Sequence, residues 1–333
     1  LLMSIPEQPA STWQAALPPG VFRCLPSLGL KGKLGLEFVA DYNSNRTTPL
    51  VLDCKLPSTN LLLESDGLCQ LGKLAGAFTY RPWGSVRQIK LGTPGIEGYT
   101  PFEQISPLLR ASVLNAEDGG FFWHRGFNAE ALAESTIENL KRGYFRRGGS
   151  TLTMQLVKNV YLGREKTLFR KLEELAIVWL IEHFRLSTKD RMFEQYLNLI
   201  EWGPEIYGIR EAADFYFRTS PARLTPLQSI FLASIIPSPR SFRYRFESQS
   251  DTLRSFNAGF FQLIGRKLVQ QKHLTEDELK ELDYRQLRLK GRALQSILKK
   301  DDPQDSLPPL NIDWIQSLLM PQAADTLINV QKP

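Results

Sequence analysis

Two neighbouring acids stand beside an aromatic cluster in the segment NAEDGGFFWHRGF, residues 115–127. Glu117 and Asp118 are followed by two glycines and then by three aromatic residues. An apolar wall removes water from one side of a carboxyl group, and such partial desolvation raises the pKa of the group toward neutrality. A carboxylate in that setting is suited to accept a proton from a substrate hydroxyl, which is general-base chemistry.

A further carboxylate lies in the segment FRKLEELA, residues 169–176, which has helical periodicity. Arg170 precedes Glu174 by one helical turn, so its guanidinium can pair with the carboxylate and keep it ionised inside the protein. The continuation LAIVWLI, residues 175–181, is apolar on every side and predicts a buried central helix. A carboxylate on a helix that is buried on most sides needs a functional or structural reason.

Positive charge and a glycine-rich turn accompany these acids. Residues 148–151, GGST, precede a helical segment, and the free N–H groups at a helix start can hold a phosphate. Residues 141–191 contain twelve Lys or Arg against five Asp or Glu. The combination favours a seat for a phosphate-bearing ligand.

Each of these features also has an ordinary structural explanation. A glutamate at a helix end is usually solvated, and a single histidine such as His124 is most often structural. A GGST turn alone is more often a loop than a phosphate site, and a helical pair such as Arg170 with Glu174 usually contributes little. Only their joint occurrence, in this order, favours chemistry.

The composition limits the class of protein. Of the 333 residues, 42% are hydrophobic and 23% charged, as is usual for globular proteins. The net charge of +6 favours anionic partners, but the chain has no helix-turn-helix, finger or RNA-binding signature, which argues against nucleic acid. Because the chain opens at Leu1 without a signal peptide, we expect it to be part of a longer protein, and a membrane anchor outside it is compatible with the sequence.

The three cysteines, Cys24, Cys54 and Cys69, are widely spaced and form no CxxC pair. This spacing indicates neither a zinc site nor a disulfide framework. No other cluster of metal-ligating residues is visible in the sequence.

A change of periodicity divides the chain. The segments LKGKLGLEFVAD (30–41) and LVLDCKL (50–56) alternate apolar and other residues and predict strands in a β-rich region. From about residue 98 the pattern becomes helical. Helices are expected from Pro107, after an N-cap at Ser106, to Gly119, over 129–140, over 168–184, over 189–200, and after a capping Thr275. One face of the 168–184 helix is expected to carry Leu168, Leu172, Leu175, Ala176 and Trp179.

Four segments stand in order along the chain: AEDGGFFWHRGF, RRGGSTLTMQLVKN, FRKLEELA and KDRMFEQYLNLIEWG. Together they resemble the peptidoglycan glycosyltransferases of glycosyltransferase family 51, which include monofunctional transglycosylases and modules of bifunctional penicillin-binding proteins. The resemblance covers roughly residues 100–245 and continues in YGIREAADFYF and SIIPSPRSF. It implies a mainly α, lysozyme-like glycosyltransferase domain at 98–270, preceded by a small β-rich N-terminal module at 1–97. Residues 271–333 would form a helical C-terminal extension and tail.

The resemblance also implies roles for individual residues. Glu117 corresponds to the catalytic base, Asp118 to a supporting acid and Glu174 to the second catalytic glutamate. The residues that match the donor and diphosphate side are Ser150, Thr151, Gln155, Lys158, Lys166, Arg170 and Lys171. Those that match structural positions of the motifs are Phe121, His124, Gly126, Gly149, Glu194, Tyr196 and Asn198. For inverting chemistry on two carboxylates, a gap of about 6.5–9.5 Å between Glu117 and Glu174 is expected.

The chain departs from the family pattern at a few positions. Gly120 replaces a residue that is usually basic, and Met154 replaces the first of two glutamines, which removes a capping box with Thr151. Lys166 replaces an arginine and keeps the charge without a bidentate fork. The fifth motif is only faintly present around Arg254.

The function implied is polymerisation of lipid II into β-1,4 glycan strands with release of undecaprenyl pyrophosphate. The implied partners are lipid II, the growing glycan strand and the bacterial membrane surface at its periplasmic face, with other cell-wall synthesis proteins as candidates. No cofactor is implied, although a divalent cation bridging the pyrophosphate is compatible with the chemistry. Two alternatives stay open: a lysozyme-like hydrolase, and a non-catalytic module that binds lipid-linked glycan or scaffolds an envelope complex.

Overall fold

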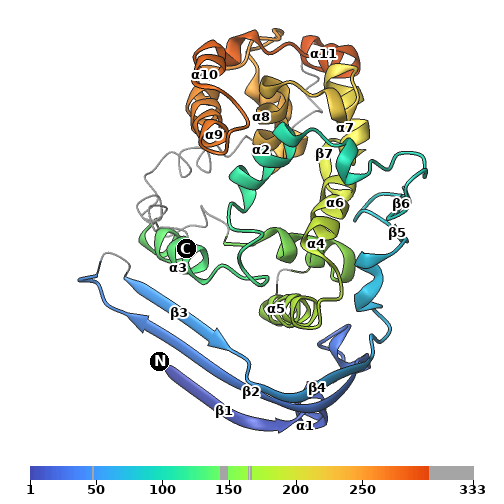
Figure 1. The fold of residues 1–333 in the computed structure, drawn as a ribbon, viewed down its shortest axis with the longest axis vertical. Coiled ribbons are helices and arrows are strands. Elements are labelled where there is room, and N and C mark those ends of the chain that lie inside the picture. Colours follow the sequence, from blue (N-terminus) through green and yellow to red (C-terminus); the bar gives the residue numbers. More distant parts are fainter. Residues whose placement is uncertain (47–48, 143–148, 164, 166, 300–333) are drawn as a thin grey trace. The chain divides into compact units, whose positions relative to one another are not determined.

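The computed structural model describes residues 1–46, 49–142, 149–163, 165 and 167–299 (Figure 1). The chain groups into two compact units. The first unit consists of residues 1–99 and 120–196, and the second of residues 100–119 and 197–333. A β-rich N-terminal region precedes a mainly helical one, as the sequence predicts. The domain boundaries at 97/98 and 270/271 stay a prediction.

The first unit opens with a sheet built around one long strand, β2 (Gly29–Tyr42). One edge of β2 pairs with β1 (Leu2–Pro9). Along the other edge, the first half of β2 pairs with β4 (Ser58–Ser65) and the second half pairs with β3 (Leu50–Lys55). The predicted alternation is confirmed along β2, where apolar side chains are half-buried and the charged ones are exposed. All pairings are antiparallel.

Short elements flank this sheet along the chain. In α1 (Ala10–Ala15), the indole of Trp13 donates a 2.6 Å hydrogen bond to the Leu34 carbonyl oxygen. After β4 come a 3₁₀ turn at Leu71–Ala75 and the hairpin β5 (Phe78–Tyr80) with β6 (Ile89–Leu91).

A disulfide joins Cys24 to Cys69, whereas Cys54 is free and exposed. The expectation of no disulfide was therefore wrong. The two cysteines are 45 residues apart in the sequence, and the chain between them contains the whole β2–β4 sheet region. Their pairing depends on how that region folds, which spacing alone does not reveal.

The helices of the first unit follow in chain order. They are α3 (Ala129–Arg142), which lies over β3, then α4 (Leu152–Tyr161), α5 (Leu168–His183) and α6 (Lys189–Leu199), whose last three residues belong to the second unit (Figure 1). The limits predicted for α3, α5 and α6 are confirmed to within two residues.

The predicted buried face of α5 is wrong in its first half. Leu168 and Leu172 are 71% and 46% exposed, whereas Glu173 and Glu174 are buried. The prediction followed the periodicity of the apolar side chains alone. Both carboxylates are nevertheless buried, because each has partners that stabilise it inside the protein, as described below. In the second half the helix buries Ile177, Val178, Leu180 and Ile181.

The second unit is helical. Its helices are α2 (Pro107–Glu117), α7 (Ile209–Phe217), α8 (Pro226–Ile235), α9 (Ala258–Gln270), α10 (Glu276–Glu281) and α11 (Gly291–Leu298), with a small hairpin of β7 (Glu201–Gly203) and β8 (Ile206–Tyr207). The helix α2 packs against α8 and α9 through a face that includes Leu109 and Val113. It begins after Ser106 and ends at Glu117, and Thr275 forms a capping box on α10, as predicted.

Arg245 is fully buried in the second unit. It donates hydrogen bonds to the Ser234 carbonyl oxygen and to the side chain of Asn257. Burial lowers the pKa of this guanidinium to about 9. Of the neighbouring arginines, Arg240 is exposed and Arg243 is half-buried.

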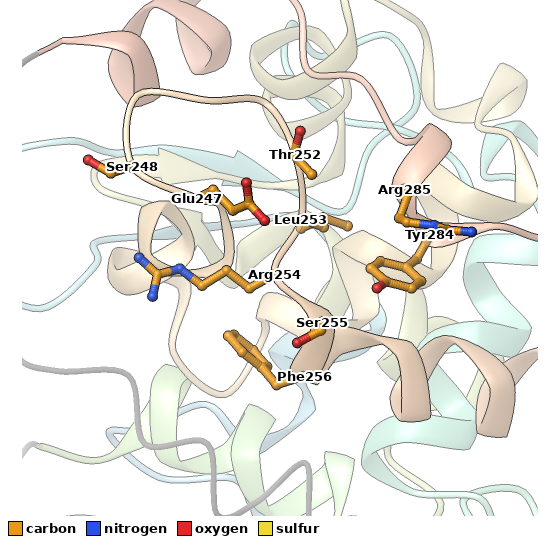
Figure 2. A pocket seen from close by; sticks show the side chains of 9 residues that line it. All are labelled: Glu247, Ser248, Thr252, Leu253, Arg254, Ser255, Phe256, Tyr284 and Arg285. Atoms are coloured by element: carbon orange, nitrogen blue, oxygen red, sulfur yellow. The ribbon is translucent and has the colours of Figure 1, made fainter.

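A surface hollow of about 520 Å³ also lies in the second unit (Figure 2). It is lined by Glu247, Ser248, Thr252, Leu253, Arg254, Ser255, Phe256, Tyr284 and Arg285. Arg254, which marks the faint fifth motif, is the one residue of the sequence analysis that lines it.

Among the residues that the structure describes, none of the helices combines the length and the apolar character needed to cross a lipid bilayer.

The disulfide should make a large contribution to stability, because it closes a loop of 45 residues. The double variant Cys24→Ser/Cys69→Ser is expected to lower the free energy of unfolding by roughly 3–4 kcal/mol, since the unfolded chain gains loop entropy. Urea denaturation followed by circular dichroism measures this loss. Cys54→Ser is the matched control and should leave the curve unchanged; equal curves for all proteins would contradict the prediction.

Candidate active site

Glu174 is the centre of a compact ionic cluster at the start of α5. Its side chain is 1% exposed and accepts from Arg170 Nη1 at 2.7 Å and from Lys171 Nζ at 2.5 Å. The predicted pair with Arg170 is confirmed, and Lys171 adds a second cation. Two positive charges face one carboxylate here, so the cluster keeps a net positive charge.

The second motif is tied to this cluster. Lys171 Nζ lies 3.2 Å from the hydroxyl of Ser150, the residue before the N-cap of α4. Both α4 and α5 begin at capping threonines, Thr151 and Thr167, whose hydroxyl oxygens accept backbone N–H groups. The starts of two helices and two cations therefore gather in the first unit, and all of them favour a bound anion.

The cap of α4 reflects the departure at Met154. The Thr151 hydroxyl oxygen accepts the Met154 N–H at 3.3 Å, but a methionine side chain cannot return a bond to the cap, so no capping box forms. Instead, the Thr151 hydroxyl donates to the Gly126 carbonyl oxygen at 2.6 Å. This bond joins the first and second motifs.

Gly126 lets this part of the first motif approach α5. Its φ is +84°, and a Cβ atom there would lie 2.4 Å from Val178 Cγ1. A side chain at this position would therefore both strain the backbone and collide with the helix. Gly149 is similarly close to α3, since a Cβ atom would lie 2.6 Å from Ser135 Oγ.

The aromatic residues of the first motif have different environments. Phe121 is buried, packs against Phe193 with ring centroids 5.9 Å apart, and has Lys189 Nζ 4.5 Å from its ring centroid. His124 lies edge-on to Phe121 and is half-buried. Phe122 and Trp123 expose 44% and 90% of their surface.

Glu117 and Asp118 end helix α2. Glu117 is the last helical residue and is half-buried, while Asp118 is the C-cap and is 8% exposed. The Asp118 N–H donates to the Leu114 carbonyl oxygen at 2.9 Å, which closes the helix. These two acids belong to the second unit and Glu174 to the first, so the gap between Glu117 and Glu174 stays a prediction.

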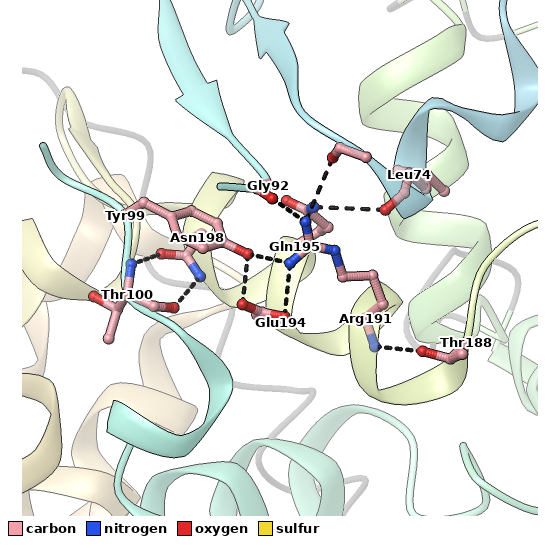
Figure 3. A network of polar contacts seen from close by, with 10 residues as sticks. Leu74, Gly92, Tyr99, Thr100, Thr188, Arg191, Glu194, Gln195 and Asn198 are labelled. Atoms are coloured by element: carbon pink, nitrogen blue, oxygen red, sulfur yellow. Dashed lines mark hydrogen bonds and ion pairs between the residues drawn. The ribbon is translucent and has the colours of Figure 1, made fainter. Parts of the chain in front are cut away.

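Polar side chains of the fourth motif form hydrogen bonds to other side chains and to the backbone (Figure 3). Glu194 accepts from the Tyr99 hydroxyl at 2.6 Å and from Arg191 at 3.0 Å. Burial, followed by the hydrogen bond to Glu194, raises the pKa of Tyr99. The side-chain amide of Asn198 bonds both the N–H and the carbonyl oxygen of Thr100, at 2.8 and 2.9 Å.

The remaining predicted residues are partly placed. The Tyr196 hydroxyl donates to the Gln155 side chain at 3.1 Å, and Lys158 lies in the last turn of α4. Lys166 lies outside the described residues. Within the described part of the chain, no group of three or more His, Cys, Asp or Glu side chains could hold a metal ion. A cation bridging a diphosphate stays a prediction.

The sequence analysis missed Glu173, which is 3% exposed and adjacent to Glu174. Its carboxylate oxygen accepts three backbone N–H groups of residues 23–25. The sequence did contain one signal for a buried Glu173, a second acid on a helix with an apolar continuation. Its partners could not be predicted, because they lie about 150 residues earlier in the chain.

Comparison with known proteins identifies the class. The profile of the family described as Transglycosylase matches residues 87–258, just over half of the chain. Relatives named biosynthetic peptidoglycan transglycosylase include those of Paraburkholderia xenovorans and Dechloromonas aromatica, each 42% identical over 144 residues. That of Nitrosomonas eutropha is 43% identical over 144 residues. These matches cover 43% of this chain and 59%, 62% and 58% of the respective relatives.

The chain therefore belongs to the transglycosylase family, as the four motifs predict. Its fold class is also confirmed: a mainly α, lysozyme-like transglycosylase domain follows a small β-rich module. The chain spans about three fifths of the length of the curated relatives that it matches.

The cations around Glu174 should stabilise the fold only while the carboxylate is charged. Arg170→Leu leaves the buried carboxylate with one partner fewer, and we expect a loss of about 1–3 kcal/mol in unfolding free energy. Glu174→Gln should remove most of that loss, because no buried charge then lacks a partner. A double-mutant cycle in urea measures the coupling.

The exposed pair of Lys31 with Glu64, 71% and 60% exposed, is the matched control. Its cycle should give a coupling below about 1 kcal/mol. A coupling for Arg170 and Glu174 as small as that of the exposed pair would show that the buried cluster has no special energetic role.

Proposed function

We propose that this chain is a peptidoglycan glycosyltransferase that polymerises lipid II into β-1,4-linked glycan strands by inverting transfer. The observation that carries the proposal is the buried Glu174 between Arg170 and Lys171, next to the starts of two helices, in a chain of the transglycosylase family. Such a cationic cluster is suited to a diphosphate leaving group.

In the proposed reaction, the Glu117 carboxylate accepts the proton of the acceptor 4-hydroxyl. The resulting oxygen nucleophile attacks the anomeric carbon of the donor sugar, and a new C–O bond forms while the bond to the diphosphate breaks. The electron pair leaves with undecaprenyl pyrophosphate. Arg170 and Lys171 neutralise the charge that develops on this leaving group, and Glu174 holds both cations in place.

The remaining predicted roles belong to the same proposal. Asp118 supports the base at the end of α2, and Ser150, Thr151, Gln155 and Lys158 line the donor side. Lys166 belongs to this set by its position in the motif. The structural positions need no contact with substrate, because Gly126, Glu194 and Asn198 fix backbone in the first and second units.

The proposed location is the periplasmic face of the bacterial cytoplasmic membrane. A disulfide such as Cys24–Cys69 persists in oxidising compartments, which the periplasm is and the cytoplasm is not. The apolar side chains of Leu168, Phe169 and Leu172 are exposed on the helix that carries Glu174, where a lipid-linked substrate would enter. Lipid II, the glycan strand and the membrane surface are thus the proposed partners.

A hydrolase would have no diphosphate to hold, so the cationic cluster favours transfer over hydrolysis. A non-catalytic binding module would need the cluster but not the base. Polymer formed from lipid II by the parent protein, and its loss in the Glu117 variant, would distinguish transfer from both alternatives.

Glu117→Gln is expected to abolish glycan polymerisation, with a loss of at least about 10²-fold in rate, because a neutral amide cannot accept the proton. Purified full chain is incubated with lipid II, and the products are separated on a glycan-strand gel. The melting temperature of the variant should match that of the parent protein. Undiminished polymer from a folded Glu117→Gln variant would refute the role of Glu117 as base.

A further inference from the structure

The buried carboxylate of Glu173 is held by the β-rich module rather than by its own helix. One carboxylate oxygen accepts the backbone N–H groups of Arg23 at 2.8 Å, Cys24 at 2.6 Å and Leu25 at 3.3 Å. Three donors converging on one oxygen form a strong seat for a buried anion. The bonds join α5 to a loop that precedes it by about 150 residues.

The donor loop is itself fixed at several points. Cys24 is bonded to Cys69, and the Ser27 hydroxyl donates to the Cys24 carbonyl oxygen at 2.8 Å. Gln14 donates from its side chain to the carbonyl oxygens of Leu25 and Leu28. The three N–H groups that face Glu173 are therefore held by covalent and hydrogen bonds inside the module.

The module also holds the end of α4. The buried Tyr161 hydroxyl donates to the Leu71 carbonyl oxygen at 2.7 Å, two residues after Cys69. Lys73 Nζ lies 4.4 Å from the centroid of the Tyr161 ring and donates to the Val160 carbonyl oxygen. The same module thus contacts the last turn of α4 and the first half of α5, on both sides of their connection.

The position of Glu173 determines what its neighbour can reach. Successive residues on an α-helix point about 100° apart, so fixing Glu173 sets the rotation of α5 about its axis. Arg170, Lys171 and Glu174 keep their mutual contacts through helical spacing, but the rotation of α5 decides where this cluster faces, and it places Lys171 Nζ 3.2 Å from the Ser150 hydroxyl. A turn of the helix by a few tens of degrees would separate Lys171 from Ser150 and move the cationic cluster away from the start of α4.

We propose that Glu173 is a positioning residue for the glycosyl transfer, and that the N-terminal β-rich module acts on catalysis by holding it. The inference rests on the proposed function, since it assigns the module a part in seating the diphosphate.

The test uses the full chain with Glu173→Ala, which removes the acceptor, and Glu173→Gln, which keeps an acceptor oxygen without the charge. We expect kcat for lipid II polymerisation, per folded molecule, to fall roughly tenfold or more in Glu173→Ala, with KM within about threefold. The kcat of Glu173→Gln should lie between the kcat of Glu173→Ala and that of the parent protein. The control Glu64→Gln removes an exposed acid of the same module and should leave kcat unchanged.

A second readout is amide hydrogen exchange of the peptide covering residues 168–176. Exchange should be at least about tenfold faster in Glu173→Ala than in the parent and unchanged in Glu64→Gln. A Glu173→Ala protein with a lower melting temperature but parental kcat and exchange would show a merely stabilising role and overturn the proposal. If that variant does not fold, Glu173→Gln decides, and parental values of kcat and exchange again overturn it.

The two proposals can fail separately. A parent protein that polymerises lipid II, a Glu117→Gln variant that does not, and unaffected Glu173 variants would leave the function standing and the positioning role refuted. A parent protein without polymerising activity would refute the function. In that case, the amide hydrogen exchange of residues 168–176 would be the only readout of whether the module fixes the cationic cluster on α5.

Discussion

The structure depends on the burial of two adjacent carboxylates, Glu173 and Glu174, in the first half of α5. A buried carboxylate loses its hydration, and only charges or hydrogen-bond donors in good geometry offset that loss. Glu174 takes two cations from its own helix, whereas Glu173 takes three backbone donors from the β-rich module. The donors to Glu173 and the contact of Lys171 with Ser150 therefore fix the position of α5, whereas the ion pairs of Glu174 stabilise the charge within the helix.

Other features of the first unit follow from this fixed helix. Gly126 has no side chain because Val178 of α5 occupies the space that one would need. The carbonyl oxygen of Gly126 then receives the hydroxyl of Thr151, which also caps α4. A glycine, a threonine and an ion pair from three separate motifs are therefore parts of one packing arrangement around α5.

The sequence was most informative where structure is local. The start of α2 after Ser106 and its end at Glu117 follow from a proline at the first turn and glycines beyond the last. The pair of Arg170 with Glu174 follows from helical spacing alone. These features involve residues within a few positions of one another, so their geometry is set by the helix itself.

Features that join distant segments were not predictable in this way. The Cys24–Cys69 bond and the donors to Glu173 both depend on the fold of the β-rich module. The periodicity of α5 placed Leu168 on the apolar face of the helix, yet Leu168 is exposed and Glu173 is buried, because the donors that stabilise Glu173 come from residues 23–25. A prediction from hydrophobic periodicity assumes that charged side chains face water. It fails where charged side chains are paired in the protein interior.

The two clearest departures from the family pattern have different physical meanings. Met154 is 2% exposed, so an amide there would have to find buried partners, whereas methionine fills the space without that demand. Its replacement of a glutamine is thus matched to the local packing. At Gly120, a Cβ atom would make only ordinary contacts, 3.6 Å from His124 and 3.7 Å from Asn128. Packing does not exclude a basic side chain at position 120, so the charge missing there is a change in electrostatics alone. Of these two departures, the one at residue 154 is thus explained by packing, whereas the one at residue 120 changes charge without a packing reason.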